Sequence, residues 1–159
     1  MRRYSVMLLA SLSAFTTASA LAGPKSVAAS SHPFKAAYVG HASGQANGSE
    51  ASGSATASGR GNPIGASTLR ASGQGLVSGQ CVDFTATTLL RGRPGAIRLA
   101  LRGGHACAGS ASRASFSGRA KVTRGTATFA GARGTLSFTG TYDIQTRAVT
   151  ISFKGRITY

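Results

Sequence analysis

The stretch CVDFTATTLLRGRPGAIRLALRGGHAC, residues 81–107, decides the fold because it contains two strand-like segments joined by a turn. In each segment apolar side chains alternate with polar ones, a period of two that is typical of a half-buried β-strand. Between the segments, RGRPG at residues 91–95 combines proline with glycines, which favours a turn. The side chains expected to face inward are Val82, Phe84, Ala86, Thr88, Leu90, Ile97, Leu99 and Leu101.

The two cysteines of the chain begin and end this stretch. In an exported protein an isolated pair is most simply a disulfide, and two free buried thiols are the alternative. Regular pairing of the hairpin places Cys81 beside Ala106 and leaves Cys107 one position away on the other face. A β-bulge at Gly103-Gly104 adds one residue and brings the two cysteines opposite each other. We therefore predict a cross-strand disulfide.

Period-two alternation continues from Phe34 to the C-terminus, and helical periodicity is absent. Residues 51–59, ASGSATASG, could be a linker, but the strict alternation of small apolar and hydroxyl residues favours a strand. About eight strands with short connections are typical of a sandwich or a closed barrel. Inward glycines make room for large side chains across a narrow lumen, which favours the barrel. They are Gly73, Gly118, Gly140 and Gly155.

The N-terminal residues predict export. Arg2 and Arg3 precede the apolar stretch VMLLASLSAFTTASALA, which ends in small residues suited to signal cleavage. A retained membrane anchor is the alternative, but the stretch is short and rich in Ser and Thr for a span. We expect a signal peptide over residues 1–22, a mobile leader over 23–33 and one β-barrel domain over 34–159. The expected location is outside the cell, in the periplasm or in the cell envelope.

The segment GTATFAGARG, residues 125–134, resembles the G-T-G-x-F-x-G-A-x-G signature of the allene oxide cyclase and dirigent-like barrels. Residues 136–143 and 155–159 are similar to the C-terminal segments of uncharacterised secreted bacterial proteins of this type. Ala127 stands where the signature has its second glycine. The resemblance implies an eight-stranded antiparallel barrel of calycin-like shape, in which the related enzymes use acids and polar groups inside the lumen. The residues expected to close one end of the barrel are Gly125, Phe129, Gly131 and Gly134.

Basic residues dominate the charge: 18 Lys and Arg face three acids, for a net charge of +15. Such a surface attracts polyanions, although scattered charge could also serve only to keep an exported protein soluble. The aromatic side chains are expected to point inward, away from the cations, so we expect nonspecific attachment to an anionic polysaccharide or lipid surface and no specific nucleic-acid binding. Arg133 is either a solvated turn residue or an anion ligand beside glycine amides. The outward cations are Arg98, Arg102, Arg119, Lys121, Lys154 and Arg156.

Few residues could carry a reaction. The acids Glu50, Asp83 and Asp143 lie far apart in the chain, so no catalytic carboxylate pair is expected. Asp143 starts a turn, where it is expected to cap its own backbone. The proposed bulge places Asp83 opposite His105, which resembles an acid orienting a base, but no serine motif accompanies them and a surface ion pair is favoured. The histidines lack metal-ligand spacing and no cofactor motif is present, so we predict no catalytic residue, metal or cofactor.

The sequence therefore favours a secreted, non-catalytic barrel that attaches through its cationic surface to anionic envelope polymers. The alternative is a lumen-binding protein, or a cyclase or isomerase, acting on a small apolar compound. A filled core would favour the first function, and an open pocket lined by tyrosine and polar groups would favour the second. A self-associating surface protein would instead expose unpaired strand edges at residues 51–59.

Overall fold

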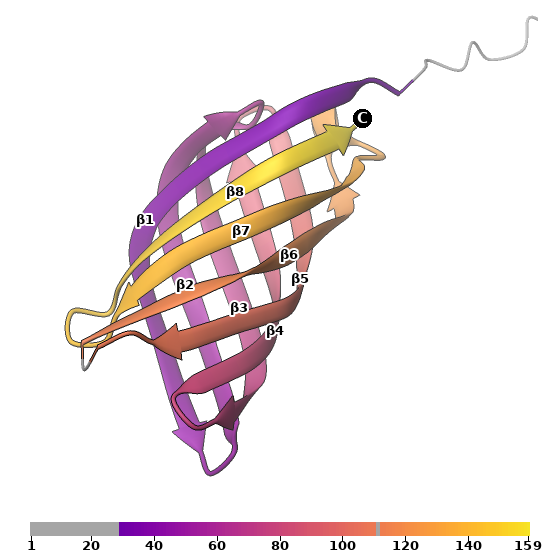
Figure 1. The fold of residues 1–159 in the computed structure, drawn as a ribbon. Helices are drawn as coiled ribbons and strands as arrows, with labels where there is room; N and C mark the ends of the chain where they lie inside the picture. Colours follow the sequence, from indigo (N-terminus) through magenta and orange to yellow (C-terminus); the bar gives the residue numbers. More distant parts are fainter. Residues whose placement is uncertain (1–28, 111) are drawn as a thin grey trace, which may run out of the picture.

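A computed structural model describes residues 29–110 and 112–159 as eight antiparallel strands that form a closed barrel (Figure 1). Each strand pairs with its neighbours in the sequence, and the last strand closes onto the first. This confirms the all-β, eight-stranded barrel. The elements are β1 (Ser31–Asn47), β2 (Glu50–Asn62), β3 (Gly65–Ser78), β4 (Cys81–Gly92), β5 (Gly95–Ala108), β6 (Arg113–Gly125), the 3₁₀-helix η1 (Ala127–Phe129), β7 (Arg133–Asp143) and β8 (Ala148–Thr158).

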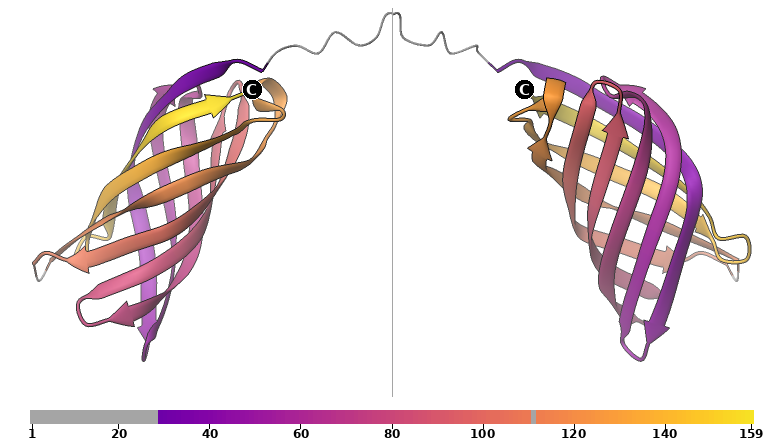
Figure 2. Two further views of the ribbon diagram at one scale, coloured as in Figure 1. Left: turned by 45° about the vertical axis from the view of Figure 1, so that its right-hand side comes forward. Right: turned by 180° about the vertical axis from the view of Figure 1, so that it is seen from behind.

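The two ends of the barrel differ. We call the end that carries η1, the β2–β3 and β4–β5 turns and the C-terminus the closed end, and the end that carries the other four turns the open end (Figures 1 and 2). Large side chains that are at most 3% exposed fill the closed end. They include Ile64, Leu90, Ile97, Val122, Phe129 and Ile157.

Barrel closure starts earlier in the chain than the sequence indicated. Strand β1 begins at Ser31, which pairs with Thr158 of β8, whereas we expected the domain to begin at residue 34. Pro33 is compatible with this strand because pairing with β2 begins only at Lys35, so the missing N–H leaves no gap in that ladder. The predicted signal peptide and the first part of the predicted leader lie outside the described residues.

Residues 51–59 lie inside β2 and pair on both sides, as the alternation predicted. Ala55 lies opposite Ala42 of β1 and Ala71 of β3. The linker alternative is therefore wrong, and the segment does not have the unpaired edge that a self-associating surface protein would expose.

The predicted bulge and disulfide are both present in the β4–β5 hairpin. The register shifts between Phe84 and Ala86, and Gly103 in the opposing strand has a φ of +57°, a conformation that glycine adopts readily. Cys81 then faces Cys107 with the Cα atoms 4.1 Å apart, and the sulfurs are bonded. The alternative of two free thiols is wrong.

The loop between β6 and β7 covers the closed end. Phe129 is fully buried and meets Tyr159 edge to face, with 5.1 Å between ring centroids. The N–H groups of Thr126 and Thr128 donate hydrogen bonds to the carbonyl oxygens of Ala96 and Pro94, which ties the loop to the β4–β5 hairpin. Gly131 and Gly134 have positive φ angles of 73° and 151°, and Arg133 is exposed.

The inward glycines predicted from the sequence do face the interior, but their physical role differs from the expected one. The atoms nearest to a Cβ on Gly118 or Gly140 would belong to phenylalanine rings of the adjacent strand, not to side chains across the lumen. Gly155 similarly lies beneath Leu136 of the adjacent β7. Glycine therefore makes room for a cross-strand neighbour, an arrangement known to stabilise strand glycines.

Candidate functional site: the barrel lumen and the outer wall

A cavity of about 270 Å³ occupies the lumen toward the open end. Its walls differ because the inward residues of β2 and β3 that line it are alanines and glycines, whereas β4, β6, β7 and β8 contribute aromatic rings. Gly53, on the inward face of β2, lines the cavity and is exposed, so the cavity communicates with solvent. The rings that line it belong to Phe84, Phe116, Phe138, Tyr142 and Phe153.

The phenylalanines form one continuous aromatic wall. Phe138 lies between Phe84, Phe116 and Phe153, with centroid separations of 6.1, 6.4 and 6.2 Å. Phe84 and Phe116 meet edge to face at 6.4 Å. These are favourable aromatic separations, so the wall is held in place by its own contacts without a ligand.

Thr88 is the deepest polar group that lines the cavity. It is 1% exposed, and its Oγ1 has no hydrogen-bond partner among the described residues. The buried hydroxyl of Tyr38 contrasts with it: it shares a hydrogen bond of 2.9 Å with the Ser67 hydroxyl, in which either oxygen can donate, and the Ser67 hydroxyl also lies 3.3 Å from the carbonyl oxygen of Gly65. Burial raises the pKa of Tyr38, and its hydrogen bond to Ser67 offsets part of that shift. Among the buried side-chain nitrogen and oxygen atoms of the described residues, Thr88 Oγ1 is therefore the one that offers an unused hydrogen bond to a molecule in the lumen.

No charged side chain lines the lumen cavity in the described part of the chain. The three acids lie at the open end but outside the lumen lining: Glu50 begins β2, Asp83 lies near the start of β4 and Asp143 ends β7. The arrangement can bury apolar surface and accept or donate one hydrogen bond at Thr88. It brings no carboxylate to the cavity for proton transfer.

Asp143 has the capping role that the sequence predicted. One of its oxygens, Oδ1, accepts hydrogen bonds from the backbone N–H groups of Gln145 and Thr146 and from the Thr146 hydroxyl, at 2.8 to 3.1 Å. The bonds from Thr146 are the main cause that lowers the pKa of Asp143, with a smaller contribution from the charge of Arg113, its cross-strand neighbour. Asp143 therefore orders the β7–β8 turn.

The predicted cations are all exposed on the outer faces of β5, β6 and β8. Two further basic residues, Lys35 and Arg124, join them through strand pairings that the sequence analysis did not anticipate. We call these eight residues the cationic wall. Like charges directly opposite each other destabilise a sheet, so an anion bound here would relieve repulsion. The opposed pairs are Arg98–Arg124, Arg102–Arg119 and Lys35–Lys154.

A shallow groove crosses the wall where β7, β8, β1 and β2 lie side by side. Ala37 forms part of its lining, with Ser152 opposite on β8 and Arg60 opposite on β2. Because the alanine side chain is short, the surface at Ala37 is recessed between the longer side chains around it. The polar side chains around it are Lys35, Arg60, Ser137, Thr139, Ser152 and Lys154, a set suited to an anionic oxygen group.

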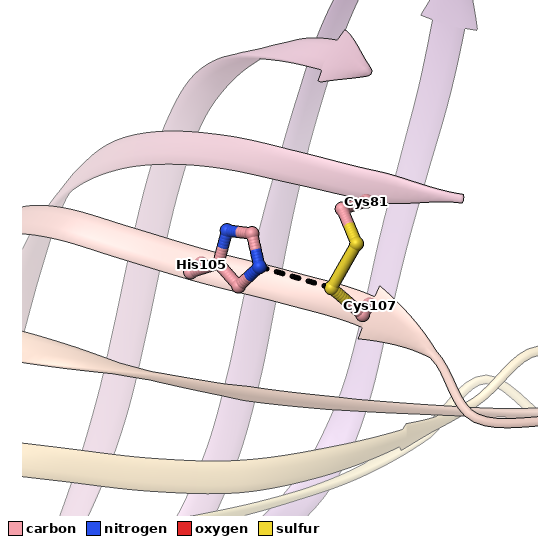
Figure 3. A group of neighbouring side chains, drawn as sticks. All are labelled: Cys81, His105 and Cys107. Atoms are coloured by element: carbon pink, nitrogen blue, oxygen red, sulfur yellow. Dashed lines mark hydrogen bonds between the residues drawn. A yellow bond between two sulfur atoms is a disulfide. The ribbon is translucent and has the colours of Figure 1, made fainter. Parts of the chain in front are cut away.

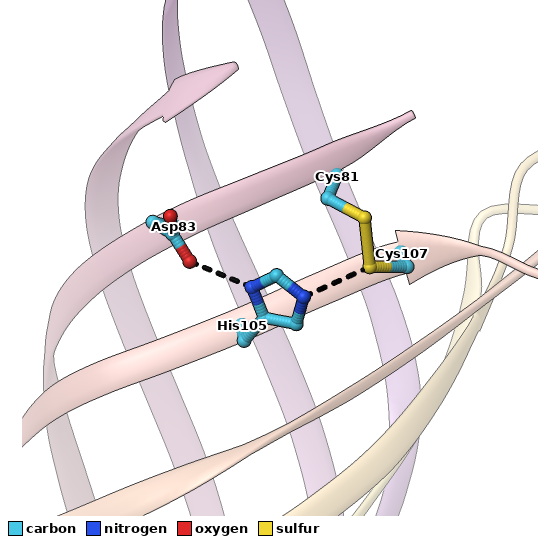
Figure 4. The surroundings of a disulfide bond; sticks show 4 residues. All are labelled: Cys81, Asp83, His105 and Cys107. Carbon is cyan, nitrogen blue, oxygen red and sulfur yellow. Dashed lines mark hydrogen bonds and ion pairs between the residues drawn. A yellow bond between two sulfur atoms is a disulfide. The ribbon is translucent and has the colours of Figure 1, made fainter. Parts of the chain in front are cut away.

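Asp83 and His105 lie opposite each other, as the bulge predicted, on the outer face beside the disulfide (Figure 4). Asp83 Oδ1 lies 2.6 Å from His105 Nδ1, and His105 Nε2 lies 3.0 Å from Cys107 Sγ. Their side chains are 73% and 56% exposed, so this is a surface pair. The sequence analysis missed the contact between the histidine and the sulfur, although His105 and Cys107 are two residues apart on one strand and so share a face.

In comparisons with protein-family models, with curated proteins and with solved structures, no match to this chain was found. Within the described residues, the only helix is the three-residue η1, and no helix there is long and apolar enough to cross a membrane. The fold and the sites define a closed antiparallel β-barrel with an apolar lumen cavity and a cationic outer wall.

Proposed function

We propose that this protein is a non-catalytic binding protein that holds a small apolar compound in the open half of its lumen. The observation that carries the proposal is the apolar lumen cavity, which is lined by five aromatic rings and opens to solvent. Its apolar lining is therefore in contact with water. A ligand that covered this lining would remove apolar surface from water, which is favourable. This is the alternative function of the sequence analysis, and the open lumen supports it over a filled core.

The lining specifies the chemistry of the ligand. At about 270 Å³ the cavity is slightly below the usual range for drug-sized ligands, which begins at roughly 300 Å³, so the compound is small. Aromatic rings on one wall and alanines and glycines on the other favour a flat ring system or a short branched hydrocarbon. One hydroxyl or carbonyl at its inner end would pair with Thr88.

The resemblance to allene oxide cyclase and dirigent-like barrels is compatible with a lumen ligand and belongs to this proposal. It implies lumen acids and polar groups for the enzymes, whereas the described lining here contains no charged residue. Binding without a reaction is therefore the function we infer. The oxidised Cys81–Cys107 pair favours the exported location expected from the N-terminal residues.

Binding of N-phenyl-1-naphthylamine, a neutral fluorescent probe, tests the lumen proposal. We expect its fluorescence to rise with the purified protein and to saturate. Ala71→Leu, which adds volume to the small-residue wall, should weaken binding at least tenfold. Ala37→Leu is the matched control because it makes the same change on the outer wall. Equal affinity in the Ala71→Leu variant, or no binding to the wild-type protein, would contradict the proposal.

A second candidate function is attachment of the barrel to anionic envelope polymers or anionic lipid. It is favoured by the three opposed cation pairs of the cationic wall, which an extended polyanion would neutralise together. The groove at Ala37 supplies hydroxyl groups beside two cations of the wall, Lys35 and Lys154, and beside Arg60. Both functions can coexist, because the wall faces outward and the cavity opens at the end of the barrel.

Salt-dependent binding to an acidic polysaccharide, and to anionic against neutral vesicles, tests the second function. We expect binding to the anionic materials that weakens steeply with salt, because exposed charges are screened within about 10 Å at 0.1 M. Lys154→Glu should weaken it more than Arg70→Glu, an identical charge reversal on the outer face of β3. Equal effects of the two charge reversals would show that net charge alone attracts the polymer. Absence of binding at physiological salt would contradict the attachment function and would indicate that the charge serves solubility.

A further inference from the structure

We propose that reduction of the Cys81–Cys107 disulfide creates a binding site for a thiophilic divalent cation, Zn²⁺, formed by the two cysteine thiolates and the His105 imidazole. The ligand atoms of these three residues all lie within 4.8 Å of one another (Figure 3). Zinc prefers cysteine and histidine ligands, and three protein ligands leave a fourth tetrahedral position for water. This inference is independent of both functions proposed above.

The β4–β5 hairpin builds the cluster. His105 and Cys107 are two residues apart on β5 and therefore project from the same face, and the bulge at Gly103 brings Cys81 opposite Cys107. The spacing of histidines along the chain does not predict this site. Its ligands come from two strands, and two of them are cysteines that the sequence assigns to a disulfide.

Asp83 gives the strongest argument that the cluster suits a metal. Its Oδ1 lies 2.6 Å from His105 Nδ1, so that this nitrogen carries the shared proton and Nε2 is left to face the sulfurs (Figure 4). Metal-binding histidines almost always donate their second N–H to a carboxylate or carbonyl in this way, which fixes the tautomer and the ring. Asp83 is one of only three acids in the chain. Its position therefore matches the outer partner of a zinc-bound histidine.

Binding depends on the redox state. A phosphine or dithiol reductant supplies two electrons, the S–S bond breaks, and each sulfur takes up a proton while the reductant is oxidised. When Zn²⁺ binds, the two thiol protons pass to solvent and the sulfurs bind as thiolates. In the disulfide the same sulfurs are joined to each other and supply no thiolate. His105 and Asp83 are 56% and 73% exposed and both cysteines are partly exposed, so reductant and ion can reach the site.

Anaerobic titration of the phosphine-reduced protein with Co²⁺, followed by displacement with Zn²⁺, tests the site. We expect one equivalent of Co²⁺ to give the visible bands of a tetrahedral complex and a sulfur-to-cobalt charge-transfer band. The oxidised protein should give neither. His105→Ala should weaken Zn²⁺ binding at least tenfold, and Asp83→Asn by about 10- to 100-fold, as partners of metal ligands commonly do.

His41→Ala is the matched control, because it removes an exposed histidine from β1, far from the cysteines in the strand register, and should leave the affinity unchanged. Circular dichroism of the reduced protein should retain the strand signal, since the packed core lies at the closed end. The inference is overturned if reduction abolishes that signal, if Co²⁺ binds without the charge-transfer band, or if the Asp83→Asn and wild-type proteins bind Zn²⁺ equally well.

Discussion

Gly118 of β6 lies directly opposite Phe138 of β7, and the Phe138 ring covers the position that a side chain at residue 118 would occupy. A Cβ on Gly118 would lie 2.7 Å from Cζ of that ring. The neighbouring inward pair has the same arrangement with the strands exchanged: Gly140 of β7 lies opposite Phe116 of β6. Each glycine thus allows a ring to lie flat along the sheet, which is how the aromatic wall fits inside a barrel.

Gly118→Ala should destabilise the protein, because the new methyl group forces the Phe138 ring out of its place in the aromatic wall. Overpacking of this kind costs about 1 to 3 kcal/mol of unfolding free energy. Chemical denaturation measures it. Gly44→Ala is the matched control, because a Cβ there meets only the Ser52 carbonyl oxygen at 3.4 Å. If both variants lose the same stability, the effect comes from strand glycines in general and the ring contact is unimportant.

Thr88→Val should raise the unfolding free energy of the ligand-free protein. The substitution removes a buried hydroxyl that has no described partner and keeps the shape of the side chain. Burial of an unpaired polar group costs about 1 to 3 kcal/mol in protein mutants, and the gain should be of that order. Thr87→Val, the same change on the exposed face of β4, is the control. No difference between the two variants would mean that the Thr88 hydroxyl is already satisfied in solution.

Much of the fold follows from local pattern. Period-two alternation identifies the strands, and the β4–β5 hairpin register requires one extra residue to bring Cys81 to Cys107, which places the bulge at Gly103. These predictions succeed because successive side chains of a strand project from opposite faces. A register error of one residue would therefore place the two cysteines on opposite faces of the hairpin.

The candidate sites are less predictable because they depend on closure of the barrel. Lys35 and Lys154 are far apart in the sequence, and only the β1–β8 pairing places them opposite each other. The cavity depends on which inward residues meet across the lumen, and alternation does not specify this. Alanine at residue 55 gives the same strand signal whether it packs against a filled core or lines an empty space.

Acid should reveal the cap at Asp143. Hydrogen bonds from Thr146 lower the pKa of Asp143 below its ordinary value of 3.8. A lowered pKa in the folded state stabilises the protein above the unfolded pKa, and this stabilisation is lost as the pH falls through the folded value. The Asp143→Asn variant should therefore be less stable than the wild-type protein at neutral pH, and the difference should shrink in acid below 3.8.

Denaturation of both proteins between neutral and strongly acidic pH measures this difference. Glu50→Gln is the control, because it removes the charge of an exposed acid at the start of β2 that caps no turn among the described hydrogen bonds. If the difference in unfolding free energy between Asp143→Asn and the wild-type protein stays constant over the whole pH range, the stabilisation does not depend on the charge of Asp143.

Alkali should act through Tyr38, whose hydroxyl is buried beside Ser67. Burial raises the pKa of Tyr38 above its ordinary value of 10.0, so the folded protein keeps the phenolic proton after the unfolded chain has released it. The stability linked to this group is complete below the unfolded pKa and is lost as the pH rises through the folded value. Tyr38→Phe should remove this loss of stability in alkali. At neutral pH the substitution should lower the unfolding free energy by about 0.5 to 1.5 kcal/mol, because the hydrogen bond to Ser67 is missing.

Wild-type and Tyr38→Phe proteins should also show equal tyrosinate absorbance just above pH 10.0 while both remain folded. Tyr159→Phe, a change at the C-terminal residue that retains the ring, is the control. If the wild-type protein shows more tyrosinate than Tyr38→Phe at that pH, Tyr38 ionises in the folded barrel and its burial does not oppose the charge.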